Sequence, residues 1–165
     1  GGFDKGGWAA PYWEGVMAQV QREAMAKPYD MLFGRKTYDL FAGHWPDRPT
    51  DPAARVMNAA RKYVITSNGS GLTWANSTAV SGELSRELSR LKSEDGPLLQ
   101  VHGSWQLVQY LLGQDLVDEI RLWTFPVTVG SGKRLFEPGA AALDLRLVKS
   151  EASSNGAVMS IYRRH

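Results

Sequence analysis

Three short polar segments, residues 34–37, 66–68 and 102–104, carry the side chains best suited to bind an anion. The first supplies a guanidinium, an ammonium and a hydroxyl group, and the second supplies hydroxyl and amide groups. In the third, Gly103 would let a ligand approach backbone N–H groups closely. Arginine holds phosphate with paired hydrogen bonds, and the start of a helix adds free N–H groups and a favourable dipole. All three segments therefore suit phosphate.

These segments are expected to meet at one edge of a parallel sheet. Each follows an apolar run that reads as a buried strand, at residues 29–33, 63–65 and 98–101. The carboxyl ends of parallel strands share an edge, and ligands of open α/β sheets bind there. Three such turns together predict a ligand with several phosphates, such as a dinucleotide. Each turn taken alone is also explained as a helix cap or a surface charge.

The elements around them indicate an α/β fold with a mostly parallel sheet. An extended run over 117–129, an alternating strand around residue 145 and a turn at Asn155 and Gly156 predict a strand-rich end that closes in an antiparallel hairpin. Because no repeat, linker or low-complexity tract divides the chain, we expect residues 1–165 to form a single domain. Helical spacing predicts helices over residues 11–27, 35–41, 53–60, 81–95 and 105–113.

Composition excludes several classes of protein. With 43% hydrophobic residues and a net charge of +2 over 165 residues, the chain is globular and too balanced in charge to indicate nucleic-acid binding. It has no cysteine, which excludes disulfides, thiol nucleophiles and zinc–thiolate sites. No apolar run reaches the roughly 20 residues of a membrane span, and no secretory signal begins the chain. We expect a cytoplasmic protein that binds neither nucleic acid nor a membrane.

Familiar catalytic motifs fail on specific residues. Gly132 and Lys133 resemble the end of a phosphate-binding P-loop, but Val127 and Arg134 stand where that loop needs glycine and serine or threonine. Neither a G-x-G-x-x-G sequence nor a G-x-S-x-G nucleophile elbow occurs. No metal site is predicted, because metal-ligand spacing is absent from the three histidines, His44, His102 and His165.

Four ordered segments resemble the dihydrofolate-reductase-like superfamily. The first, MLFGRKTY at residues 31–38, is similar to its cofactor-binding segment, and KYVITS at 62–67, VHGSWQLV at 101–108 and the stretch 116–136 follow in the same order. The closest likeness is to the reductase domain of the bifunctional deaminase/reductases of bacterial riboflavin biosynthesis and its stand-alone relatives. This resemblance implies a three-layer α/β/α fold, a hydride supplied by NADPH and a homodimer. The first central strand of that family has no match before Gly1.

The resemblance also assigns roles to individual residues. Trp13 and residues Gly130, Ser131 and Gly132 would contact the substrate, and Glu14 on the first helix would help to deliver a proton. No metal ligand is implied. The residues that would bind the cofactor are Gly34, Arg35, Lys36, Thr37, Thr66, Ser67, Asn68, His102, Gly103, Ser104, Trp105 and Gln106.

The sequence therefore predicts an enzyme, an NADPH-dependent oxidoreductase that reduces a small pyrimidine- or pterin-like heterocycle. It resembles the 5-amino-6-(5-phosphoribosylamino)uracil reductase of riboflavin biosynthesis. Two alternatives stay open at this point. One is a non-catalytic nucleotide-binding or regulatory module on the same fold, since a fold does not by itself imply activity. The other is a true dihydrofolate reductase.

Overall fold

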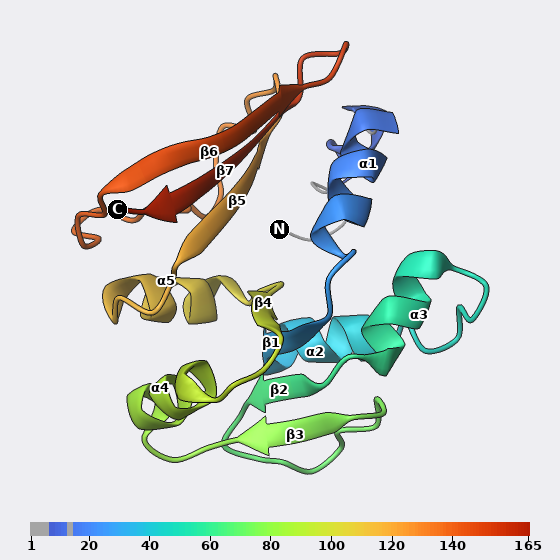
Figure 1. Cartoon of the computed structure of the whole chain (residues 1–165), viewed down its shortest axis with the longest axis vertical. Coiled ribbons are helices and arrows are strands. Elements are labelled where there is room, and N and C mark those ends of the chain that lie inside the picture. Colours follow the sequence, from blue (N-terminus) through green and yellow to red (C-terminus); the bar gives the residue numbers. More distant parts are fainter. Residues whose placement is uncertain (1–6, 13–14) are drawn as a thin grey trace. The chain divides into compact units, whose positions relative to one another are not determined.

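The computed structural model describes residues 7–12 and 15–165 (Figure 1). Two compact units make up the chain. The parallel-sheet unit comprises residues 25–116, and the antiparallel unit comprises residues 117–165 with the described part of residues 1–24. The single domain over residues 1–165 stays a prediction.

The parallel-sheet unit contains four parallel strands in the order β3-β2-β1-β4, which confirms the predicted α/β class with a parallel sheet. Leu32 of β1 is paired with Tyr63 of β2 on one side and with Val101 of β4 on the other. Helices follow β1, β3 and β4, because parallel strands need a crossover connection (Figure 1). The elements of this unit are β1 (Tyr29–Gly34), α2 (Arg35–Ala42), α3 (Pro52–Ala59), β2 (Lys62–Ile65), β3 (Ser77–Val80), α4 (Leu84–Ser93), β4 (Leu98–Val101) and α5 (Trp105–Gly113).

Strand β1 forms the centre of this unit, and all six of its residues are buried. Met31 and Phe33 pack in one hydrophobic cluster with Tyr38 of α2 and with Trp74, which precedes β3. Fully burying a side chain of this size stabilises a fold by roughly 1.5–3 kcal/mol. A strand covered on both faces reads as a nearly continuous apolar run, which is why this strand is visible in the sequence.

The antiparallel unit consists of a three-stranded sheet in the order β5-β7-β6 and of helix α1. A hairpin joins β6 to β7, as predicted, and Gly156 in its turn has a φ of +88°. The small core contains Ala157 and Met159, against which Tyr12 and Trp123 pack. The elements are the 3-10 turn Ala10–Tyr12, α1 (Gly15–Ala24), β5 (Glu119–Thr124), β6 (Leu145–Ala152) and β7 (Val158–Arg164).

Several element boundaries differ from those expected. Strand β3 was not predicted, because its four residues show no clear apolar alternation; it forms by pairing with β2. The helix expected over 81–95 is confined to α4, because the Glu83 side chain caps its start by accepting from the N–H groups of Ser85 and Arg86.

The extended run expected over 117–129 is a strand only as far as Thr124. Pro126 lies just beyond that end and has no N–H group to donate to a sheet. The helix expected over 11–27 is α1, which ends at Ala24. Over residues 7–12 and 15–165, no helix has both the length and the apolar character needed to cross a membrane.

A buried lysine connects three parts of the parallel-sheet unit. Lys62 of β2 is 0% exposed, and its Nζ donates to the Asn58 carbonyl at 2.8 Å and to the Ala75 carbonyl at 3.0 Å. The same Nζ lies 4.4 Å from the ring centroid of Trp74. Burial lowers the pKa of Lys62 to about 8. Lys62 therefore ties the end of α3 to the segment before β3.

We predict that Lys62 makes the free energy of unfolding depend on pH in the alkaline range. Its pKa is 10.5 in a solvated chain and about 8 in the fold, so between these values the unfolded state binds the additional proton. The free energy of unfolding of the wild type, relative to Lys62→Met, should thus rise by up to about 3 kcal/mol as the pH increases through this window. Urea unfolding of both proteins measures the difference, and parallel pH profiles would contradict it.

Candidate functional site

The turns that follow β1 and β4 touch each other at the carboxyl edge of the parallel sheet. The Gly34 N–H group donates to the Gly103 carbonyl oxygen over 3.0 Å. A Cβ on Gly34 would collide with Ser104 Oγ, although the φ of −78° at Gly34 suits any residue. Gly103 has a φ of +122°, and a Cβ there would lie 3.0 Å from Thr37 Oγ1. Glycine is therefore required on both sides of this contact.

The polar segment 66–68 joins the same edge through Arg35. The guanidinium of Arg35 donates from Nη1 to the carbonyl oxygens of Asn68, at 3.1 Å, and Ser70, at 2.9 Å. The loop has its own hydrogen bonds, since Thr66 Oγ1 donates to the Asn68 carbonyl and Asn68 Oδ1 accepts from the Ser70 N–H group. The structure thus brings the three polar segments together, while their binding of a cofactor stays a prediction.

Two helices begin at this edge without a side-chain cap. Gly34, which has no side chain, stands at the N-cap of α2, and Ser104, whose hydroxyl forms no capping hydrogen bond, stands at the N-cap of α5. In contrast, Asp51 and Glu83 cap α3 and α4 with carboxylate oxygens. An uncapped helix start offers free N–H groups and the positive end of the helix dipole. Because the two uncapped starts adjoin through Gly34 and Ser104, they form a local environment that favours an anion.

The remaining predicted cofactor residues lie around these turns. His102 is exposed, and its ring lies against the rings of Phe41, Phe33 and Tyr29 with centroid separations of 5.9, 6.0 and 6.3 Å. This places an imidazole beside the aromatic cluster at the end of β4. The side chains of Lys36, Ser67 and Gln106 are exposed, whereas those of Thr37, Thr66, Ser104 and Trp105 are partly buried.

The predicted substrate residues belong to the other unit. Residues 130–132 form an exposed loop in which Gly130 has a φ of +72° and Gly132 a φ of +155°. Trp13 and Glu14 lie outside the described residues. Their contacts with a substrate and the proton delivery by Glu14 stay predictions.

Sequence reasoning missed two residues that shape this edge. Asp39 accepts a hydrogen bond of 2.8 Å from Arg35 Nε, and the spacing of four residues on a helix was a signal that could have identified it. Gly71 has a φ of +72°, and a Cβ on it would lie 3.3 Å from Arg35 Nη2. No local pattern marks Gly71, because its neighbour Arg35 is distant in the sequence.

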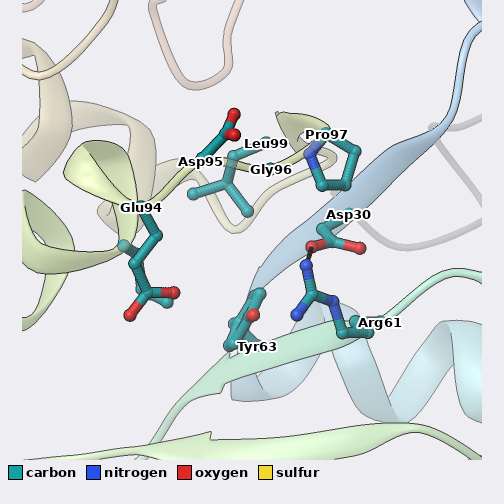
Figure 2. Close-up of a pocket in the computed structure, with 9 residues that line it drawn as sticks. Asp30, Arg61, Tyr63, Glu94, Asp95, Gly96, Pro97 and Leu99 are labelled. Atoms are coloured by element: carbon teal, nitrogen blue, oxygen red, sulfur yellow. Dashed lines mark ion pairs between the residues drawn. The ribbon is translucent and has the colours of Figure 1, made fainter.

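A separate hollow of about 50 Å³ opens beside the first residues of β1, β2 and β4. Figure 2 shows the ion pair inside it, in which Arg61 Nη2 lies 2.7 Å from Asp30 Oδ2. The carboxylates of Glu94 and Asp95 point in different directions. Within the described ranges, no group of three or more His, Cys, Asp or Glu side chains is placed to hold a metal. The hollow is far smaller than the roughly 300–1,000 Å³ of typical ligand pockets, so it does not suit a heterocyclic substrate.

Comparison with known proteins identifies relatives of this chain. The profile of the RibD C-terminal domain family matches residues 4–159. The uncharacterised protein YyaP of Bacillus subtilis (strain 168) is 27% identical over 137 residues, which are 80% of this chain and 72% of YyaP. These matches extend over most of both units.

Solved structures show the same fold at low identity. A protein described as a candidate riboflavin biosynthesis protein from Shewanella sp. PV-4 is 23% identical with a TM-score of 0.66, covering 93% of this chain and 80% of its own. A pyrimidine reductase-like protein from Corynebacterium diphtheriae is 12% identical with a TM-score of 0.62, covering 96% and 85%. A diaminohydroxyphosphoribosylaminopyrimidine deaminase/5-amino-6-(5-phosphoribosylamino)uracil reductase from Thermotoga maritima is 13% identical with a TM-score of 0.62, covering 93% and 50%.

We predict that Gly34→Ala will separate the two turns. The added methyl group collides with Ser104 Oγ. The free energy of unfolding, measured by urea titration, should therefore fall by about 1–3 kcal/mol. Adding Ser104→Gly should recover part of the loss, because Ser104 Oγ and Cβ are the two nearest atoms. The control is Gly43→Ala, whose Cβ would meet its nearest atom at an ordinary 3.5 Å. Equal effects of the two glycine substitutions would contradict the contact described.

Proposed function

Because the chain belongs to the RibD C-terminal domain family, we propose that it is an NADPH-dependent reductase of a small heterocyclic substrate. The observation that carries the proposal is the adjacency of two uncapped helix starts, those of α2 and α5, where three polar segments converge. The names of the similar solved structures, which include a pyrimidine reductase-like protein, support a pyrimidine over a pterin as the substrate class.

The residues at this edge fit the phosphates of a dinucleotide. The pyrophosphate would accept from backbone N–H groups in the first turns of α2 and α5, which Gly34 and Gly103 allow to pack against each other. Thr37 would add a hydroxyl group. Arg35 and the loop 66–68 would contact the additional phosphate that distinguishes NADPH from NADH. When bound, NADPH supplies the hydride.

The task of the protein in such a reaction is to position and to shield. Hydride transfer needs the donor and the acceptor carbon held close and aligned, and it needs no protein nucleophile. This agrees with a chain that has no cysteine. His102 lies against Tyr29, Phe33 and Phe41, and this aromatic surface would hold the nicotinamide side of the cofactor away from water. In the proposal, Glu14 or a bound water molecule delivers the proton.

Binding is tested by titrating NADPH and NADH against the fluorescence of the six tryptophans. We predict that Arg35→Ala weakens NADPH binding by about tenfold, the loss expected for one charge-assisted hydrogen bond, and changes NADH binding by less than about twofold. Arg55→Ala is the matched control, because Arg55 is an exposed cation on α3 whose guanidinium forms no hydrogen bond with any described residue. Equal losses for both cofactors, or no loss, would contradict the assignment of Arg35.

Turnover is tested by following NADPH absorbance with three classes of substrate. We expect oxidation of NADPH with 5-amino-6-(5-phosphoribosylamino)uracil or a related pyrimidine. Tight binding of NADPH without oxidation by any pyrimidine or pterin would instead indicate a regulatory module. Reduction of dihydrofolate that antifolates inhibit would indicate a true dihydrofolate reductase.

A further inference from the structure

The guanidinium of Arg35 donates most of its hydrogen bonds to acceptors within the protein. Nε donates to Asp39 Oδ1 at 2.8 Å, and Nη1 donates to two carbonyl oxygens of the loop that follows β2. Nη2 forms no hydrogen bond with any residue that the structure describes. Because Nε and Nη1 are both engaged, Arg35 can offer an incoming anion only the Nη2 amino group.

Gly71 is a close neighbour of that amino group. The backbone of Gly71 has a φ of +72°, and a Cβ there would lie 3.3 Å from Nη2, tighter than an ordinary contact. Glycine at this position therefore adds no side chain that would crowd Nη2. The side chain of Arg35 is 33% exposed, so an anion can reach it from solvent.

The ion pair between Arg35 and Asp39 is not explained by the stability of helix α2. Arg35 is the first residue of the helix and Asp39 begins its last turn, which is the reverse of the arrangement that a helix dipole favours. Local rules of this kind are most often broken at functional sites. The side chain of Asp39 is 51% exposed, and its negative charge faces the same solvent as Nη2.

These contacts give Asp39 two opposite effects on a phosphate bound to Arg35. Its oxygen holds the guanidinium in position for the loop carbonyls, which leaves Nη2 for a ligand. Its charge repels the phosphate and so weakens the attraction of Arg35. We propose that Asp39 is a specificity-determining residue that limits the preference of this edge for NADPH over NADH. This inference rests on the proposed function.

The test separates the charge of Asp39 from its hydrogen bond. Asp39→Asn keeps an oxygen that can accept from Arg35 Nε but removes the charge. NADPH should bind about fivefold more tightly to this variant at low salt, NADH should change by less than about twofold, and the gain should shrink as salt is added. Asp39→Leu removes the acceptor as well, so it should bind NADPH less tightly than Asp39→Asn does. Asp47→Asn, which removes an exposed carboxylate that forms no ion pair with any described residue, is the matched control.

The outcomes distinguish this inference from the proposed function. If the wild type binds no NADPH, both the proposed function and the role of Asp39 are wrong. If the wild type binds NADPH but Asp39→Asn leaves the ratio of the two affinities unchanged, or lowers it, the inference falls and the proposed function stands. A shift in the ratio that is as large for Asp47→Asn would also overturn it, because the effect would then belong to net charge and not to Asp39.

Discussion

The hydrogen bond from the Gly34 N–H group to the Gly103 carbonyl is the constraint on which the candidate site depends. It joins the end of the buried central strand to the turn before α5, and it leaves no space for a side chain on Gly34. The starts of α2 and α5 therefore lie side by side. Neither helix has a side-chain cap, so the positive ends of two helix dipoles adjoin at this edge. Two adjacent helix starts without side-chain caps cost the fold stability. A bound anion would offset this cost by accepting hydrogen bonds from their N–H groups.

The charge of Arg35 is balanced within the protein before any ligand arrives. Arg35 is held by the Asp39 carboxylate and by two loop carbonyls, and this arrangement fixes the loop 66–71 against α2. Attraction for a phosphate then comes from backbone dipoles, from one amino group of Arg35 and from the exposed ammonium of Lys36. Such a site recognises shape and hydrogen-bond geometry more than net charge, which agrees with an overall charge of only +2.

Much of this arrangement could be predicted from the sequence, because the signals are local. The apolar run 29–33 and the glycine that follows it indicate a buried strand and a turn, and both are present. Parallel pairing then places the strand ends together without further information. Strand β3 could not be predicted, because it exists through its pairing with β2 and its own residues carry no strand pattern. The roles of Gly71 and Lys62 could not be predicted from the sequence either, since both depend on neighbours that are remote in the sequence.

In the proposed function, the starts of α2 and α5 together hold the phosphates of a dinucleotide. A crystal structure of the protein with NADPH would show where these phosphates bind. We expect pyrophosphate oxygens within hydrogen-bond distance of N–H groups in residues 35–37 and 104–106, with the additional phosphate beside Arg35 Nη2. NADPH bound elsewhere on the protein, with both helix starts free of phosphate, would contradict it.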